Sequence, residues 1–225
     1  MGAQLKITNL RKTFVKNGQR IDVLRGVNLT IKNGESIAIV GVSGAGKTTL
    51  IHILGTIERP TSGTVEIDGI DVFSWGEREL ASFRNRKIGF IFQFFNLLPE
   101  FTSLENVMMP ALLGGLSRRE AKIKAELILN EVGLGDRMTH KPGELSGGEQ
   151  QRVAVARALI MDPDIVLADE PTGNLDTRTG GMIEELLLDL NIKRKVTLIV
   201  VTHNRKLASK MSRMIDLVDG RIADE

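Results

Sequence analysis

The sequence predicts an α/β protein with a largely parallel sheet, an antiparallel β subdomain near the N-terminus and a helical insert in the middle. Two apolar runs late in the chain, residues 165–168 (IVLA) and 196–201 (VTLIVV), flank a helical pattern over 179–190. Buried β-branched runs that alternate with helices are typical of a parallel sheet covered on both faces. The first third of the chain instead contains short strands separated by tight turns, which indicates antiparallel pairing.

Composition sets the class of protein. The chain has 225 residues, is 42% hydrophobic, and carries a net charge of +2 with no cysteine. These values exclude a disordered chain, a disulfide-stapled scaffold and a strongly basic nucleic-acid binder. No apolar run approaches the roughly 18 residues that a membrane span needs, so any membrane role would be peripheral. We expect one domain over residues 1–225.

The N-terminal strands are predicted from β-branched runs bounded by turn residues. Turns are expected at Asn17-Gly18, Asn33-Gly34 and Asp68-Gly69. The strands between them are expected over residues 4–10, 22–31, 36–40 and 63–67.

The middle of the chain, from about residue 77 to 133, reads as mostly helical. Good helix formers dominate residues 118–132, and Pro99, Pro110 and Gly114-Gly115 interrupt the pattern. We expect a helical subdomain at about 94–150, inserted into the α/β core.

The strongest chemical signal is the run GVSGAGKT over residues 41–48. It follows an apolar strand and precedes a helix, as the phosphate-binding pattern G-x-x-x-x-G-K-[ST] requires. Backbone amides freed by the glycines and the helix N-terminus would hold phosphates. The candidate nucleotide-binding residues are Gly41, Ser43, Gly44, Ala45, Gly46, Lys47, Thr48 and Thr49.

Two of these residues have predicted chemical roles. Lys47 would reach the β- and γ-phosphates and assist catalysis, and the Thr48 hydroxyl would bind Mg²⁺. The alternative is a glycine turn that merely joins a strand to a helix. A dinucleotide fingerprint is excluded because the third glycine of G-x-G-x-x-G is missing.

A pair of acids, Asp169 and Glu170, ends the apolar strand 165–168. Parallel sheets bind ligands at the carboxyl ends of their strands, so both acids are expected beside the phosphate loop. Asp169 would bind Mg²⁺ and Glu170 would orient or deprotonate the attacking water. A solvated turn is the simpler alternative.

The run LSGGEQQR over residues 145–152 opens a further helix. Ser146 and Glu149 fit the S-x-x-E capping box, which is a sufficient structural explanation. A capped helix start with two glycine amides, Gly147 and Gly148, is also able to hold a γ-phosphate.

With these motifs in order, the chain resembles the ATP-binding cassette ATPases over essentially its whole length. The matching features are the phosphate loop, Gln93, the Leu-Ser-Gly-Gly-Glu signature, Asp169-Glu170, Asn174-Leu175-Asp176 and His203. The resemblance implies a RecA-like P-loop NTPase core with the two subdomains described above, and an ATPase that uses ATP and Mg²⁺.

The resemblance also implies further site residues. Gln93 would sense Mg²⁺ and the membrane partner, and the catalytic His203 would contact the γ-phosphate. Ser146, Gly147, Gly148 and Asp176 would act across an ATP-dependent, head-to-tail dimer. Phe14 stands where the family usually has a tyrosine that stacks on adenine. The alternative for Phe14 is a place in the core.

The implied partners are a second copy of the chain and integral membrane permease subunits. A cytoplasmic helix of the permease would enter a groove near residues 93–101 (QFFNLLPEF), although these aromatic and aliphatic residues could instead be core. The chain would then lie on the cytoplasmic face of the inner membrane, with no nucleic-acid partner.

Finer features look most like the subgroup that contains the ATPases of lipoprotein-releasing systems. These features are FFNLLP at 94–99, ENVMMP at 105–110, ADEPTGNLD at 168–176 and MSR at 211–213. Macrolide or peptide exporters and cell-division ATPases belong to the same subgroup and are the alternatives. A soluble nucleotide-gated clamp on nucleic acid is a further alternative, but the chain lacks heptad arms and a cysteine hook.

Overall fold

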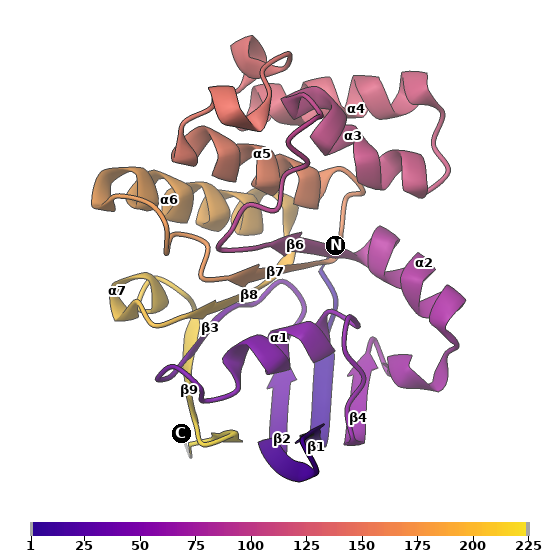
Figure 1. The fold of residues 1–225 in the computed structure, drawn as a ribbon, viewed down its shortest axis with the longest axis vertical. Coiled ribbons are helices and arrows are strands. Elements are labelled where there is room, and N and C mark those ends of the chain that lie inside the picture. The colour runs from indigo at the N-terminus through magenta and orange to yellow at the C-terminus, as the bar shows by residue number, and fades with distance from the viewer. Residues whose placement is uncertain (1, 224–225) are drawn as a thin grey trace.

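The computed structural model describes residues 2–223, which form two sheets and a set of helices around them (Figure 1). The antiparallel sheet has the order β2-β1-β4-β5. Its strands are β1 (Leu5–Lys16), β2 (Gln19–Ile31), β4 (Ser62–Ile67) and β5 (Ile70–Asp71). Asn17 and Gly18 both have positive φ, at 52° and 78°, as the two-residue turn of the β1–β2 hairpin requires. The predicted antiparallel subdomain is confirmed, with longer strands than expected, but the expected strand 36–40 lies in the other sheet and pairs in parallel there.

The second sheet has the order β10-β9-β3-β8-β7-β6 and is parallel except between β9 and β10. Its strands are β3 (Ser36–Val40), β6 (Ile88–Ile91), β7 (Ile165–Asp169), β8 (Thr197–Thr202), β9 (Arg213–Val218) and β10 (Arg221–Ile222). The strands β3 and β8 are buried throughout. The carboxyl ends of β3, β7 and β8 therefore meet at one edge of a buried sheet.

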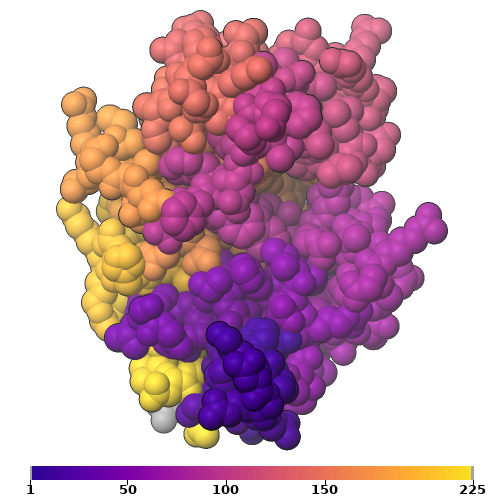
Figure 2. Space-filling view, viewed as in Figure 1, coloured from indigo at the N-terminus to yellow at the C-terminus, as the bar shows by residue number. Residues whose placement is uncertain are grey.

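The helices cover both sides of this sheet. They are α1 (Lys47–Leu54), α2 (Glu77–Lys87), α3 (Ser103–Leu113), α4 (Arg118–Glu131), α5 (Gly147–Leu159), α6 (Thr177–Arg194) and α7 (Arg205–Ala208). α1 lies between the two sheets, and its apolar residues join the antiparallel sheet in one core cluster. α3, α4 and α5 pack on one another in the other core cluster and form the top of the molecule (Figure 2). Within residues 2–223, no helix combines the length and apolar character that crossing a membrane requires.

One strand lies in the block that was expected to be mostly helical. β6 follows α2 directly and pairs with β7 in the parallel sheet. It has only four residues, too few to show a period in the sequence. A Cβ on its Gly89 would lie 2.3 Å from the carbonyl oxygen of Ala158, so the glycine allows β6 to approach α5 closely.

Pro110 does not interrupt a helix as expected; it lies inside α3. Thr102 and Glu105 form a capping box at the start of this helix, and Val107 and Ala111 are fully buried. Packing and capping thus offset the hydrogen bond that proline removes near the end of the helix.

Candidate active site

A cavity of 850 Å³ opens where the carboxyl ends of β3, β7 and β8 meet the start of α1. Its lining combines the phosphate loop with both acids and His203, as the sequence predicted. The lining residues are Val23, Val42, Ser43, Gly44, Gly46, Lys47, Thr48, Thr49, Gln93, Asp169, Glu170 and His203.

The phosphate loop curls at two glycines. Gly44 and Gly46 have φ of 84° and 100°, in the left-handed region that glycine adopts without strain. A Cβ on Gly46 would also lie 3.0 Å from the carbonyl oxygen of Val23, on the hairpin. Because Gly46 directly precedes α1, the free amides and the positive end of the helix dipole face the cavity. The loop is therefore built to hold anions.

Lys47 brings a buried positive charge to the same place. Its side chain is 9% exposed, and Nζ donates hydrogen bonds to the carbonyl oxygens of Gly41 at 2.8 Å and Val42 at 3.0 Å. These partners are neutral, so the charge is solvated by the loop itself and remains available to an anionic ligand.

Asp169 and Thr48 lie together at the floor of the cavity. Burial raises the pKa of the Asp169 carboxyl, and a hydrogen bond from the Thr48 side chain partly opposes that rise. Mg²⁺ commonly takes one or two protein ligands and completes its shell with phosphates and water. No group of three His, Asp or Glu residues within 2–223 could hold a metal by itself. This pair of oxygen ligands fits a Mg²⁺ ion that arrives with a nucleotide.

Glu170 is held at three points. Its carboxylate accepts hydrogen bonds from the Thr202 hydroxyl and the His203 main-chain N–H, both at 2.9 Å, and lies 2.7 Å from Nδ1 of His203. The glutamate side chain is 15% exposed and the histidine 72%. Glu170 also has φ of 45°, a strained conformation for a residue other than glycine, and such strain concentrates at active sites.

Gln93 reaches the cavity from the end of β6. Its Nε2 donates to Oδ1 of Asn174 at 3.2 Å, while Nδ2 of Asn174 donates to the main-chain carbonyl of Gln93 at 3.0 Å. The two amides thus fix Gln93 beside the loop that follows Glu170.

Two predicted phosphate-loop residues lie beneath the cavity. Ala45 is buried, and its carbonyl oxygen accepts from the N–H of Gly220. A Cβ on Gly41 would lie 2.3 Å from the carbonyl oxygen of Leu217, so this glycine allows the loop to pack on β9. These two residues support the phosphate loop and do not line the cavity.

The signature residues are not brought to the cavity of their own chain. Ser146, Gly147, Gly148 and Asp176 are absent from its lining. Ser146 caps α5: its hydroxyl accepts from the Glu149 N–H at 3.3 Å and donates to the Glu149 carboxylate at 2.7 Å. The predicted capping box is confirmed. Asp176 similarly caps α6 by accepting from the N–H groups of Arg178 and Thr179.

Glu149 places a negative charge at the start of the signature helix α5. Hydrogen bonds from Ser146 and from Arg137 lower the pKa of its carboxyl to about 2. Nε of Arg137 lies 2.8 Å from Oε1 of Glu149, so the negative charge at this helix start is paired.

Phe14 lies on the β1–β2 hairpin and does not line the cavity. Its side chain is 38% exposed, and Nζ of Lys12 lies 4.8 Å from the ring centroid. Placement in the core is therefore wrong for Phe14, whose exposed ring lies under the Lys12 ammonium.

Sequence reasoning missed several residues of the site. Val23 has no motif to signal it, because only the fold brings the hairpin over the phosphate loop. Asn174 belongs to a quoted motif, but its contact with Gln93 was not foreseen; Thr202 stands next to His203, where a search for hydrogen-bonding side chains would have found it.

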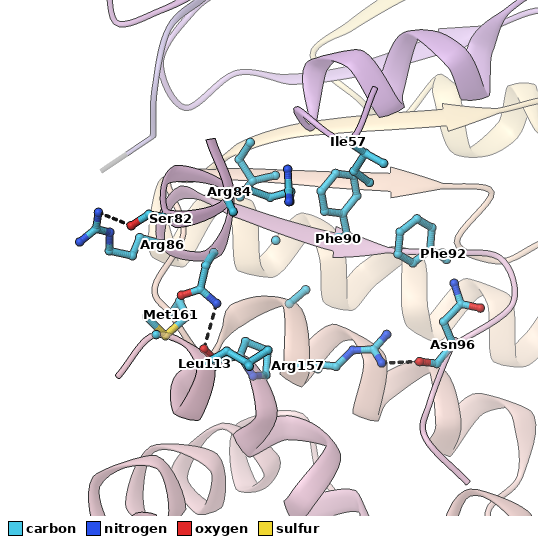
Figure 3. Close-up of a pocket in the computed structure, with 17 residues that line it drawn as sticks. Ile57, Ser82, Arg84, Arg86, Phe90, Phe92, Asn96, Leu113, Arg157 and Met161 are labelled. Atoms are coloured by element: carbon cyan, nitrogen blue, oxygen red, sulfur yellow. Dashed lines mark hydrogen bonds between the residues drawn. The ribbon is translucent and has the colours of Figure 1, made fainter. Parts of the chain in front are cut away.

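A second cavity, of 770 Å³, is a groove between α2, β6, α3 and α5 (Figure 3). Phe90 and Phe92 stack with centroids 5.4 Å apart on one side, and Arg157 on the opposite side donates to the carbonyl oxygen of Asn96. Leu113 is 77% exposed at its edge. Within the expected segment 93–101, Asn96 lines the groove. Phe94, Leu98 and Phe101 are exposed, so the core interpretation is wrong for them.

Known proteins resemble this chain over nearly its whole length. Residues 24–173 match the family model described as ABC transporter. The lipoprotein-releasing system ATP-binding protein LolD of Syntrophus aciditrophicus is 67% identical over 218 residues, covering 97% of this chain and 98% of that protein. The dimeric structure of MJ0796, a bacterial ABC transporter cassette, has a TM-score of 0.90 and 43% identity over 98% of this chain and 97% of that one. A post-hydrolysis dimer of MJ0796 bound to ADP and Pi matches equally well.

Proposed function

Because this chain belongs to the ABC transporter family of ATP-binding proteins, we propose that it drives the release of lipoproteins from a membrane through permease subunits. The chain is an ABC-type ATPase that binds ATP in the cavity at the phosphate loop. The proposal that the cargo is a lipoprotein rests on the 67% identity to a lipoprotein-releasing ATPase over nearly the full length of both chains.

The cavity residues divide the work of hydrolysis. Lys47 and the loop amides would hold the β- and γ-phosphates. Phe14, on the hairpin outside the cavity lining, would stack on the adenine. Thr48, Asp169 and Gln93 would hold Mg²⁺, which neutralises charge that develops on the phosphates. Glu170 would accept a proton from the attacking water, since its carboxylate is fixed by three hydrogen bonds and faces the cavity. His203 would hold the γ-phosphate from the exposed side.

Completion of the site would require a second copy of the chain. The start of α5 offers free amides at Gly147 and Gly148 together with the Ser146 hydroxyl, yet none of these lines the cavity of the same chain. A head-to-tail dimer would place this helix start against the γ-phosphate bound by the partner copy, where its dipole favours negative charge. ATP would then join the two copies and hydrolysis would release them.

Two substitutions test the proposed dimer and the proposed role of Glu170 as the general base. Glu170→Gln keeps hydrogen bonding but removes the base, so turnover should fall by about 10²- to 10⁴-fold while an ATP-bound dimer accumulates in size-exclusion chromatography. Ser146→Arg, added to Glu170→Gln, should abolish that dimer without loss of ATP binding. The single variant Ser146→Arg, in an otherwise wild-type chain, should lose ATPase activity; hydrolysis at full rate by a single copy of that variant would contradict the dimer.

The groove of Figure 3 is the proposed seat of a cytoplasmic permease helix. Its lining includes Phe90, Phe92 and Leu113, as an apolar helix face requires, and also Arg84, Arg86 and Arg157 without any Asp or Glu. A helix that carries both apolar and acidic side chains fits this surface best. Such docking would hold the chain at the cytoplasmic face of the inner membrane.

Leu113→Glu tests this seat against a matched control, Ile192→Glu. Both residues are highly exposed aliphatics, at 77% and 72%, and Ile192 does not line the groove. With permease subunits co-expressed, Leu113→Glu should lose co-purification from membranes and keep ATP binding, while Ile192→Glu keeps both.

A separate experiment tests the cargo. If the ATPase activity of the reconstituted complex rises with an acylated lipoprotein and does not respond to a macrolide, the proposal of lipoprotein release is supported. The opposite response favours an exporter.

A further inference from the structure

Gln151 is a buried polar side chain that the ATPase site leaves without a role. It lies in α5, the helix that begins at the signature, and its exposed fraction is 0%. A fully buried amide carries a large desolvation cost, so its hydrogen-bond partners indicate why it is there.

The amide of Gln151 joins three functional segments. Nε2 donates to the main-chain carbonyl oxygen of Pro171 at 2.6 Å and, more weakly, to that of Phe92 at 3.5 Å. Pro171 directly follows Glu170, and Phe92 directly precedes Gln93. One side chain on the signature helix therefore contacts the main chain beside the proposed base and beside the proposed Mg²⁺ sensor.

The orientation of this amide is fixed by its neighbours. Both partners are carbonyl oxygens, which accept only, so the NH₂ group must face them. Oε1 is then left buried without a hydrogen-bond partner among residues 2–223. An apolar side chain would avoid this unpaired acceptor but would remove the donor to the Pro171 and Phe92 carbonyls.

The bond to Pro171 acts on a strained turn. Glu170 has φ of 45° and precedes a proline, and the ring of a following proline further restricts the conformations open to a residue. Strained main chain persists only where its surroundings hold it in place. The bond from Gln151 is one such restraint, and it originates in α5, close to the helix start that Ser146 caps.

We propose that Gln151 is a positioning residue that ties the signature helix to the main chain of Glu170 and Gln93. A shift of α5 moves the Gln151 amide and with it two carbonyl groups, one next to Glu170 and one next to Gln93. The placement of the catalytic carboxylate thereby depends on the placement of the signature helix.

Gln151→Met tests the proposal, because methionine fills a similar volume and donates no hydrogen bond. Misplacement of catalytic groups by about 1 Å costs up to about 10²-fold in rate, so kcat should fall at least tenfold while the Kd for ATP stays within about twofold. Gln150→Met is the matched control: the neighbouring glutamine donates to the Leu145 carbonyl on its own helix start and touches neither Phe92 nor Pro171. This control should keep kcat within about twofold.

The two measurements separate positioning from packing. A lower melting temperature with unchanged kcat in Gln151→Met would overturn the proposal, as would an equal loss of kcat in Gln150→Met. Retained ATP binding with reduced kcat supports it.

Gln151→Glu provides a second test that does not depend on the methionine variant folding. Burial raises the pKa of a carboxyl, and only the protonated form donates to the Pro171 carbonyl. Turnover relative to the wild-type chain should therefore be at least threefold higher at pH 6 than at pH 8.5. A ratio that does not change with pH, measured well below the melting temperature, would overturn the proposal.

Discussion

Nδ1 of His203 lies 2.7 Å from Oε1 of Glu170, and the same carboxylate oxygen accepts the main-chain N–H of His203 at 2.9 Å. This double contact ties the end of β8 to the residue after β7, two neighbouring strands of the parallel sheet. The glutamate is shielded and the histidine is exposed to the cavity. The pair therefore presents a shielded acceptor and an exposed imidazole to the same cavity.

His203→Ala is expected to impair the chemical step more than binding. Glu170 keeps its bonds from the Thr202 hydroxyl and the residue-203 N–H, so the carboxylate stays in place. Loss of one group that stabilises the transition state typically lowers kcat by about 10²- to 10³-fold. Steady-state phosphate release should show this fall with a KM that changes little. A raised KM with normal kcat would assign His203 to ground-state binding alone.

Lys47→Ala is expected to weaken ATP binding by about 10- to 100-fold, because hydrogen bonds to charged groups contribute about 1.5–3 kcal/mol. Its present partners are carbonyls of its own loop, so the fold should persist. Calorimetric titration measures the affinity. Lys124→Ala, which removes a surface lysine paired with Asp162, is the control and should bind ATP normally. Equal affinities in the two variants would contradict the role of Lys47.

Gly148→Ala is expected to be destabilised by about 1–3 kcal/mol through overpacking. An added Cβ would lie 2.4 Å from Cγ2 of Thr179 on α6. Thr179→Ser removes that methyl group and keeps the hydroxyl, so the double variant should regain most of the stability. Urea denaturation measures both.

Gly181→Ala is the control for that pair. It also lies in a helix, and an added Cβ meets nothing within 4 Å. It should stabilise the protein by about 0.8–1 kcal/mol, from helix propensity alone. A Gly148→Ala variant as stable as this one would show that α5 and α6 can separate without cost.

The contribution of Glu149 to stability is expected to depend on pH. Its carboxyl has a pKa of about 2 in the folded chain, against about 4.3 when unfolded. The ionised form is favoured by folding, so its stabilisation is complete above about pH 4.3 and is lost as pH falls toward 2. Urea denaturation should show wild type more stable than Glu149→Gln at pH 6, with the difference shrinking at pH 3. A constant difference would contradict the low pKa.

Several site residues were predictable because each motif carries its own local geometry. The phosphate loop, Asp169, Glu170 and His203 each end or follow an apolar strand, and parallel strands of one sheet bring their carboxyl ends to a common edge. The Ser146–Glu149 capping box was likewise predictable from spacing alone. Each of these predictions depends on residues that are close together in the sequence.

Other features depend on segments that are distant in sequence. The strand β6 was missed because four residues show no period and acquire their strand identity only by pairing with β7. Gln151 looks like an ordinary helical glutamine until Phe92 and Pro171 converge on it. The sequence by itself determined the class of fold, the ATPase chemistry and the candidate reacting groups, since these follow from short motifs. The tertiary structure alone decided that the signature residues lie outside the cavity of their own chain, and that a buried amide of the signature helix contacts the main chain beside Glu170 and Gln93, because packing between distant elements sets both.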